Sequence, residues 1–412
     1  MSLRAALIFL SCSLLLLMSL FYRASSAIIA PILISDLGLT PNDLGLLGGC
    51  FFYSFAVIQL PLGLFIDKIG PKVTMIVLNS IAVVGAVVFA TSKSPTLAIV
   101  GRSLLGFGVA SNLMGPLKIF TRWFEPRKFA TMSGSLLSLA SLGSLAACSP
   151  LAVLVDFLGW RGSFYALAGV HFLLIVFMIF VVRDQRGDRP DSKNDHKGIR
   201  PGWLHSYTAL FSSWSYWAIS FSVFLRYGAF ACIQSLWAGP FLIGLLGLSP
   251  ITAGNILLLM NLGFIVGAPI GGSLSDRILR SRKKAIFLAY SISAGASFTL
   301  AYYQGSSSLI VLGFIFFVIG FFNAFNQISF AHIKELMPEE ISGSAMTGIN
   351  FFLMMGAGVF THGLGIILDK VSGPTTTAAY YSQAFLICFV AFALSSIFYL
   401  TVRDPNMSLT KG

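Results

Sequence analysis

The chain has 412 residues, of which 56% are hydrophobic, 14% aromatic and only 10% charged. Soluble domains carry about a quarter charged residues, so this composition excludes a disordered chain and argues against a soluble enzyme. A bilayer core needs about 20 apolar residues per helical span, and a chain of this length has room for about twelve spans with their loops. We therefore predict an all-α membrane protein.

Apolar runs place the first predicted span at the amino terminus. The run after Arg4 passes Arg23 and continues to Ile34, which is too long for the apolar region of a signal peptide. Further apolar runs follow, six in all on each side of one long hydrophilic segment. The twelve predicted spans cover about residues 5–35, 43–67, 73–92, 96–120, 129–155, 162–182, 216–245, 251–275, 284–303, 308–333, 343–368 and 379–402.

The hydrophilic segment runs from Arg183 to His205, contains both charge signs and carries Pro190 and Pro201. This composition is typical of a linker between two halves. We predict an amino-terminal six-helix bundle at residues 1–183, a cytoplasmic linker at 184–207 and a carboxy-terminal six-helix bundle at 208–412.

Two short motifs recur in the second half at a common offset of 209 residues. Motifs that share one offset indicate duplication, so we expect the two halves to be pseudo-symmetric. Thr40 and Ser249 are the predicted N-caps of the second helix of each half, with proline in the first turn. The repeated pairs are Leu37-Gly38-Leu39-Thr40-Pro41 with Leu246-Gly247-Leu248-Ser249-Pro250, and Gly63-x-x-x-Asp67-Lys68 with Gly272-x-x-x-Asp276-Arg277.

The net charge is +12, from 27 Lys and Arg against 15 Asp and Glu. If the amino terminus is cytoplasmic, 21 of the 27 basic residues fall in predicted cytoplasmic segments, and only Lys93, Arg161 and Lys370 fall in outer loops. Positive residues collect in loops that stay in the cytoplasm. We therefore predict an integral protein of the inner membrane with both termini cytoplasmic, and the charge requires no nucleic-acid partner.

The stretch from Gly63 to Lys72 resembles the loop signature of the major facilitator superfamily, G-x-x-x-D-(R/K)-x-G-x-(R/K), between the second and third spans. Arg102-x-x-x-Gly106-x-Gly108 resembles the fourth-helix motif of that family. The resemblance implies two six-helix bundles around a central cavity that opens to each side in turn. Glycine at position 63 is expected to allow close helix approach. The resemblance assigns gating to Gly63, Asp67, Lys68, Gly272, Asp276 and Arg277.

Three arginines, Arg23, Arg102 and Arg226, lie inside predicted spans, while all fifteen acids fall in loops or at helix ends. An arginine at a helix centre costs about 2.5–3.5 kcal/mol on insertion scales, so it usually faces a cavity or a partner. A guanidinium without a buried counter-ion can bind an anion bidentately. We predict that Arg23 and Arg226 bind an anion; the alternative is that each bonds backbone carbonyls or reaches the interface.

The same arginines resemble those of the sugar-phosphate/phosphate antiporters of the superfamily. Arg23 lies eight residues before Pro31, and Leu225-Arg226-Tyr227-Gly228 matches their seventh helix. The resemblance implies that Arg23 and Arg226 clamp the substrate. The fourth-helix histidine of those antiporters has no counterpart here, so carboxylates stay open beside phosphorylated compounds.

Further candidates complete the predicted site. Tyr22, Tyr227 and Gln234 lie near the two arginines in sequence, and Asn323, Asn326 and Gln327 recur at i, i+3 and i+4, the spacing of one helical face, in the predicted tenth span. Arg102 and His362 are the predicted coupling residues: histidine titrates near neutral pH, and the resemblance of the fourth-helix motif implies a structural or proton-handling role for Arg102. His171 is an alternative to His362.

The sequence contains no phosphate-binding loop, no nucleophile–base pattern and no metal-ligand spacing, and its five cysteines lie in apolar runs. We predict no enzyme activity, cofactor or metal site. We expect a secondary active transporter that moves a small organic anion, either a phosphorylated compound or a carboxylate, by symport or exchange. Its expected partners are that substrate, the lipid bilayer and a coupling ion, proton or sodium, with a monomer as the default state. A proton-coupled exporter of amphipathic compounds or drugs and a non-transporting nutrient sensor are the alternatives.

Overall fold

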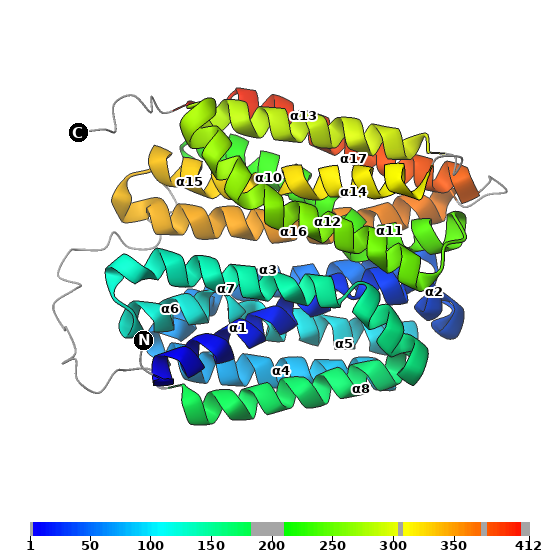
Figure 1. Ribbon diagram of the computed structural model, residues 1–412, viewed down its shortest axis with the longest axis horizontal. Helices are drawn as coiled ribbons and strands as arrows, with labels where there is room; N and C mark the ends of the chain where they lie inside the picture. The colour runs from blue at the N-terminus through cyan, green and yellow to red at the C-terminus, as the bar shows by residue number, and fades with distance from the viewer. Residues whose placement is uncertain (1–2, 183–209, 304–307, 372–376, 405–412) are drawn as a thin grey trace. The chain divides into compact units, whose positions relative to one another are not determined.

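The computed structural model describes residues 3–182, 210–303, 308–371 and 377–404, and every regular element in them is helical (Figure 1). Contacts divide the chain into two compact units, Met1–Lys193 with Ser235–Asn255, and Asn194–Gln234 with Ile256–Gly412. The predicted linker at 184–207 lies outside the described residues, so the predicted bundle boundaries stay a prediction.

The first part of the chain forms helices joined by short turns. They are α1 (Leu3–Ala24), α2 (Ser26–Leu37), α3 (Pro41–Lys68), α4 (Pro71–Thr91), α5 (Pro95–Gly108), the 3₁₀ turn η1 (Ala110–Asn112), α6 (Met114–Trp123), α7 (Pro126–Ala146) and α8 (Ser149–Val181). The second part continues with α10 (Trp214–Cys232), η2 (Ile233–Trp237), α11 (Ala238–Pro240), η3 (Phe241–Leu245), α12 (Pro250–Ser273), η4 (Leu274–Ile278), α13 (Arg282–Ala301), α14 (Leu309–Asn323), α15 (Asn326–Leu336), α16 (Glu339–Val371) and α17 (Thr377–Leu400). The segments η2, η3 and η4 are π-helical.

Ten of the described helical segments are long and apolar enough to cross a membrane. The predicted second and fifth spans are helical too, as α3 and α7, and Met132–Ala146 is one of two shorter apolar helices. Each of the twelve predicted spans is therefore helical over its described residues apart from short breaks, which confirms the predicted all-α membrane fold.

Several predicted spans are interrupted rather than continuous. The first is divided into α1 and α2, the fourth into α5 and α6, and the tenth into α14 and α15. α8 runs through the predicted loop between the fifth and sixth spans and turns at Gly159, where φ is +68°. An apolar run predicts a span but not its breaks, because those depend on which groups of the protein satisfy the freed backbone.

The predicted N-caps of the duplicated motif are confirmed. The Thr40 side chain accepts a hydrogen bond from the Asp43 backbone N–H at 3.1 Å, and the Ser249 Oγ accepts one from the Thr252 N–H at 3.1 Å. Gly38 and Gly247, two residues before each cap, have φ of +62° and +65°, a conformation that side chains disfavour. The repeat therefore encodes one turn geometry twice.

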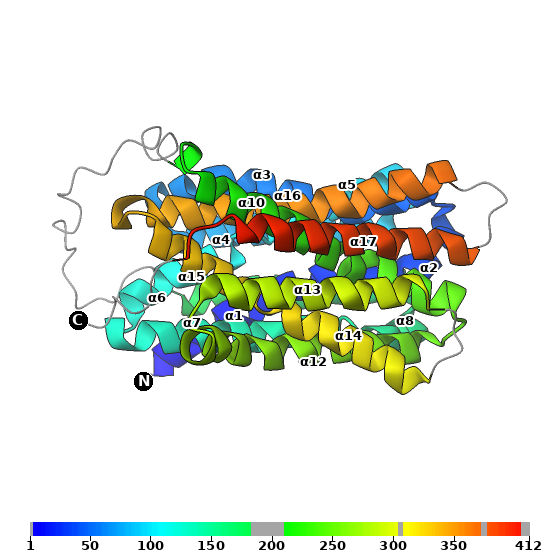
Figure 2. The same cartoon turned by 90° about the horizontal axis from the view of Figure 1, so that it is seen from above.

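Each unit packs through close helix contacts. A buried cluster joins α1, α6, α7 and α8 through Ile8, Leu15, Ile119, Leu136 and Met178. In the second unit, α13 and α17 lie side by side (Figure 2), and α10 packs on α16.

The expected close approach at Gly63 is wrong for this structure. A Cβ placed on Gly63, or on its repeat partner Gly272, would meet no atom within 4 Å. The glycines that bring helices together are others, such as Gly143, whose Cβ would lie 2.0 Å from the Leu17 carbonyl oxygen of α1. The motif glycines stay predicted gating residues, but packing is not their role here.

Candidate functional site

The first unit breaks its first predicted span beside Arg23. α1 ends at Ala24 and α2 begins at Ser26, and the Ser25 hydroxyl donates a hydrogen bond to the Tyr22 carbonyl at 3.0 Å. Lipid offers no partner to a backbone carbonyl freed at such a break, so the protein must supply one.

Arg102 supplies that partner. Its side chain is buried in α5, and Nη1 donates to the same Tyr22 carbonyl at 2.9 Å. The guanidinium also lies 5.1 Å from the Phe51 ring centroid and 5.9 Å from that of Phe89. Arginine stays protonated in proteins, so these contacts fit a residue that positions the break. The predicted coupling role of Arg102 stays a prediction.

Arg23 and Tyr22 are adjacent in sequence but have different surroundings. Arg23 is half-buried, and its guanidinium lies 5.5 Å from the Phe55 ring centroid on α3. Tyr22 is fully buried, and its ring packs against Phe164 and His171 of α8. The contacts of Tyr22 are packing contacts, and its predicted role in substrate binding stays untested.

His171, the alternative coupling residue, belongs to a buried polar network. Its Nε2 lies 2.9 Å from the Asn79 Oδ1, and the Asn79 side chain donates to the Asn112 Oδ1 at 2.7 Å. Asn112 in turn donates to the Leu15 carbonyl of α1 at 2.9 Å. This network ties α4, η1 and α8 to α1, which is a structural role.

The second unit surrounds Arg226 with groups from three helices. Arg226 on α10 is 1% exposed, and its Nη1 donates to both the backbone and the side-chain oxygen of Asn323, the former at 3.0 Å. Its guanidinium lies 5.7 Å from the Tyr227 ring centroid and 5.4 Å from that of Tyr290 on α13. We call Arg226, Tyr227, Tyr290 and Asn323 the Arg226 cluster.

One edge of this guanidinium is unused. Nε and Nη2 of Arg226 are buried without a hydrogen-bond partner among the described residues, and no ion pair there involves this arginine. These two nitrogens lie on the same side of the planar group and form the fork that matches two oxygens of a carboxylate or phosphate. A buried donor left unpaired costs about 1–3 kcal/mol, so this edge is suited to a ligand.

Asn323, Asn326 and Gln327 do not share one helical face as predicted, and their predicted roles in substrate binding stay predictions. Asn323 ends α14 and Asn326 begins α15, so the three residues do not follow one helix. Asn323 and Asn326 are buried, while Gln327 is exposed. The Asn326 Oδ1 is buried without a partner among the described residues, so it is available to a donor. The break is what gives Asn323 its place beside Arg226.

Gln234 lies in the π-helical turn η2, where its Nε2 donates to the Asn261 Oδ1 of α12 at 2.9 Å. The π-helix removes the regular spacing that would place Gln234 on the face of Arg226. Tyr227 is almost fully buried and belongs to the Arg226 cluster. The substrate roles of both stay predictions.

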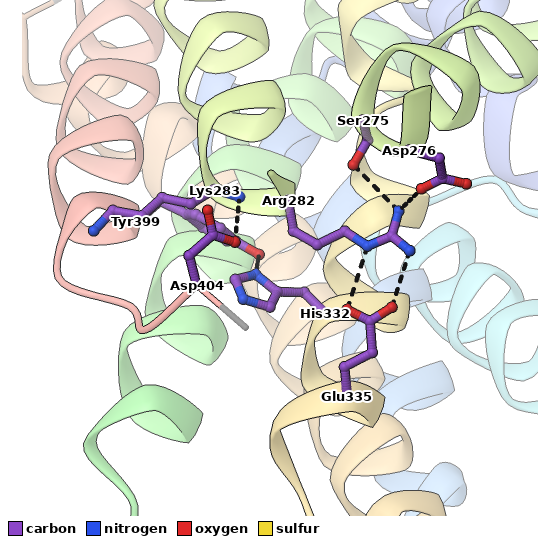
Figure 3. Close-up of polar contacts among 8 residues, drawn as sticks. All are labelled: Ser275, Asp276, Arg282, Lys283, His332, Glu335, Tyr399 and Asp404. Carbon is purple, nitrogen blue, oxygen red and sulfur yellow. Dashed lines mark hydrogen bonds and ion pairs between the residues drawn. The ribbon is translucent and has the colours of Figure 1, made fainter. Parts of the chain in front are cut away.

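The second copy of the loop motif forms a polar network around Arg282 (Figure 3). Arg282 contacts Asp276, donates to the Ser275 hydroxyl at 3.2 Å, and donates through two nitrogens to Glu335 at 2.9 and 3.3 Å. Arg277 is exposed. Sequence reasoning found Asp276 but missed Arg282 and Glu335 as its companions.

The structure describes fewer side chains in the first copy of the motif. Lys68 is exposed at the end of α3, and the Asp67 side chain lies outside what the structure describes. The gating role of both copies stays a prediction.

The histidines differ in their surroundings. His362 on α16 is half-buried, whereas His332 on α15 is fully buried between two hydrogen bonds. Sequence reasoning missed His332, since only its spacing of three residues from Glu335 on one helix marks it.

Helices that are long and apolar enough to cross a membrane, two of them carrying a buried arginine, define a membrane protein. The family model of the Major Facilitator Superfamily matches residues 12–361 and 219–412, and the chain belongs to this family. Because its members are transporters, the predictions of a transporter and of a protein other than an enzyme are confirmed.

Curated relatives and solved structures agree with this assignment. A "probable sulfoacetate transporter" from Cupriavidus necator is 27% identical over 266 residues, which are 63% of this chain and 62% of that protein. A "probable hexose phosphate transport protein" from Chlamydia trachomatis is 21% identical over 375 residues, 84% and 81% of the two chains. The inward-facing, unoccupied crystal structure of a bacterial homologue of the human lysosomal transporter Spinster shares the fold, with a TM-score of 0.79, 13% identity and coverage of 98% and 97%.

Proposed function

We propose that this chain is a secondary active transporter of a small organic anion, and that Arg226 holds the anionic group. The observation that carries the proposal is the unused edge of the buried Arg226 guanidinium, Nε with Nη2. Asn323 engages the other side through Nη1, so the plane of the guanidinium is fixed before a ligand arrives. A pre-organised fork loses little conformational entropy when it binds two oxygens.

The charge balance supports an anion. Arg226 has aromatic rings and an amide around it, and no described residue forms an ion pair with it. A cation inside a membrane protein without a paired acid favours a negatively charged ligand. The relatives named for sulfoacetate and hexose phosphate transport point to the same class, because both substrates are small organic anions.

Arg23 is the proposed second anion-binding residue. This role is proposed for two reasons. Arg23 and Pro31 resemble the antiporter pattern, and Arg23 is half-buried beside the break between α1 and α2, where Arg102 bonds the Tyr22 carbonyl. We further propose that the protein lies in the inner membrane with both termini in the cytoplasm, that it is a monomer, that the two loop motifs gate it, and that transport is coupled to an ion.

The test compares Arg226→Lys and Asn323→Asp with the wild type in proteoliposomes. The probes are radiolabelled sulfoacetate, glucose 6-phosphate and glucuronate in counterflow exchange. Lysine keeps the charge but loses the fork, so we expect about ten-fold weaker apparent affinity. Asn323→Asp supplies the missing acid and should reduce affinity at least as much, because the new carboxylate pairs with Arg226.

Two controls make the result specific. Arg4→Lys changes an exposed arginine of α1 and should leave exchange unchanged. Asn323→Ser keeps a small polar group without a charge, so it separates the loss of the amide from the gain of an acid in Asn323→Asp. Unchanged affinity in both Arg226→Lys and Asn323→Asp would contradict the proposal. Binding of these anions without exchange would favour the sensor, and exchange of cationic amphipathic compounds alone would favour the exporter.

A further inference from the structure

A path of buried side chains connects the end of α17 with the Arg226 cluster. It begins at His332 on α15, whose Nδ1 lies 2.9 Å from the Tyr399 hydroxyl and whose Nε2 lies 2.9 Å from the Arg403 carbonyl oxygen. Figure 3 shows the imidazole joined to the Tyr399 hydroxyl, with Asp404 beside it. The imidazole is completely buried, so both hydrogen bonds are protected from competing water.

The Arg403 carbonyl decides the tautomer of His332. A carbonyl oxygen can only accept, so Nε2 carries the hydrogen in the neutral imidazole. Nδ1 is then an acceptor, and the Tyr399 hydroxyl donates to it. The only vacant protonation position of His332 is thus Nδ1, on the side of the tyrosine.

The path continues from Tyr399 toward Arg226. The rings of Tyr399 and Tyr290 pack edge to face, with centroids 6.0 Å apart. The Ser329 hydroxyl lies 3.3 Å from the Tyr290 hydroxyl and also interacts with Tyr399. The Tyr290 ring in turn lies against the Arg226 guanidinium. Side chains from α10, α13, α15 and α17 therefore form one continuous series of buried contacts.

We propose that His332 is the binding site for the coupling proton of anion transport, an inference that rests on the proposed function. The proton adds to Nδ1 and converts the neutral imidazole to imidazolium, and the same proton leaves from Nδ1 on the other side of the cycle. Because both ring nitrogens then donate, Tyr399 must change from donor to acceptor and turn its hydrogen toward Ser329. Because the Ser329 hydroxyl also lies 3.3 Å from the Tyr290 hydroxyl, this reversal of the hydrogen-bond direction extends to Tyr290, whose ring contacts Arg226.

The charges around His332 suit a group that gains and loses a proton. Glu335 on α15 and Asp404 after α17 are the acids that face it, and Arg282 on α13 is the facing cation. Arg282 is already engaged by Asp276 and Glu335, and Asp404 accepts a hydrogen bond from Ser281. The two acids favour the imidazolium, whereas burial and Arg282 oppose it, so neither protonation state is held by an ion pair of its own among the described residues.

The experiment separates coupling from translocation. Proteoliposomes carry the wild type, His332→Gln or Tyr399→Phe, and the probes are radiolabelled sulfoacetate and glucose 6-phosphate. Counterflow exchange needs no net proton movement, whereas a gradient of about one pH unit can drive about ten-fold accumulation per coupled proton. We expect His332→Gln to keep counterflow while accumulation falls to simple equilibration, and Tyr399→Phe to reduce accumulation in the same direction.

Controls keep each outcome decisive. Arg4→Lys should retain accumulation. His362→Gln, on α16, tests the rival coupling residue: if it uncouples transport and His332→Gln does not, the assignment is overturned. It is also overturned if His332→Gln accumulates normally, or loses counterflow while its melting temperature stays that of the wild type. If His332→Gln does not fold, normal accumulation by folded Tyr399→Phe overturns the relay.

A second measurement does not require transport. Histidine ¹⁵N spectra of the whole protein in nanodiscs, assigned by His332→Gln, should show the Nε2–H tautomer and gain a proton on Nδ1 as the pH falls. Absence of that protonation overturns the inference even where exchange is normal. Failure of the wild type to exchange any anion while His332 titrates counts instead against the proposed function.

Discussion

Asp36 lies one residue beyond the predicted first span, where it joins α2 to α8. Its Oδ2 accepts a hydrogen bond from the Trp160 indole at 3.0 Å and pairs with Arg161, which also donates to the Ser92 carbonyl at 2.9 Å. The Arg161 guanidinium stacks on the Trp160 ring, 4.3 Å from its centroid. The Trp160 and Arg161 hydrogen bonds hold the pKa of Asp36 below its ordinary value of 3.8.

This contact predicts a pH-dependent part of the stability. A lowered folded-state pKa means that the contribution is complete above the ordinary value and is lost as the pH falls through the lowered one. Because the pair is exposed, we expect at most about 1 kcal/mol. Thermal unfolding in detergent between about pH 7 and pH 3 measures it. Asp36→Asn should melt lower at neutral pH and lose part of the acid dependence; identical pH profiles would contradict this.

At single residues, the sequence predicts some surroundings and misses others. Its span and the absence of buried acids single out Arg226, which is buried with a vacant edge, and its role as an anion ligand stays a prediction. Gln327 was predicted beside Asn323 and is exposed instead. Helical spacing locates a face only while the helix continues, and the break after Asn323 removes that condition.

At the scale of elements, a one-residue insertion explains a displaced motif residue. The first copy of the loop motif ends in Lys72, five residues after Asp67, whereas Arg282 follows Asp276 by six. Asp276 lies in the π-helical turn η4, and such a turn accommodates one extra residue in a helix. Arg282 therefore completes the second copy, and its contact with Asp276 was hidden from a fixed-offset comparison.

Packing of α1 on α7 gives a prediction at this scale. A Cβ on Gly143 would meet the Leu17 backbone oxygen at 2.0 Å, and backbone cannot move aside as a flexible side chain can. Gly143→Ala should cost about 1–3 kcal/mol through forced separation of the two helices. A lower melting temperature in detergent would show it.

The matched control lies on the same helix. Gly134 would place a Cβ in open space, with nothing within 4 Å, so Gly134→Ala should raise the stability by about 0.4–1 kcal/mol by restricting the unfolded chain. Equal melting temperatures for the two variants would contradict the close approach at Gly143.

At the scale of the whole molecule, the distribution of Lys and Arg predicts the orientation in the membrane. The five cysteines are buried, so a single introduced cysteine reports its own exposure. Lys93 and Arg277 are both exposed and fall on opposite predicted sides. A membrane-impermeant maleimide should label Lys93→Cys in spheroplasts and Arg277→Cys only after permeabilisation, and the reverse pattern would contradict the orientation.

The class of this protein can be inferred from its amino-acid pattern alone: its apolar spans, its duplicated turn with caps at Thr40 and Ser249, and its basic residues gathered on one predicted side. These features are local or additive, since composition, spacing and capping act over a few neighbouring residues. Other contacts are visible only in the folded chain: Arg102 bonds the carbonyl at the break of the first span, Asn323 accepts from Arg226, and His332 lies between Tyr399 and Arg403. Each of those contacts joins residues at least 67 positions apart, so it depends on how helices pack rather than on any pattern along the chain.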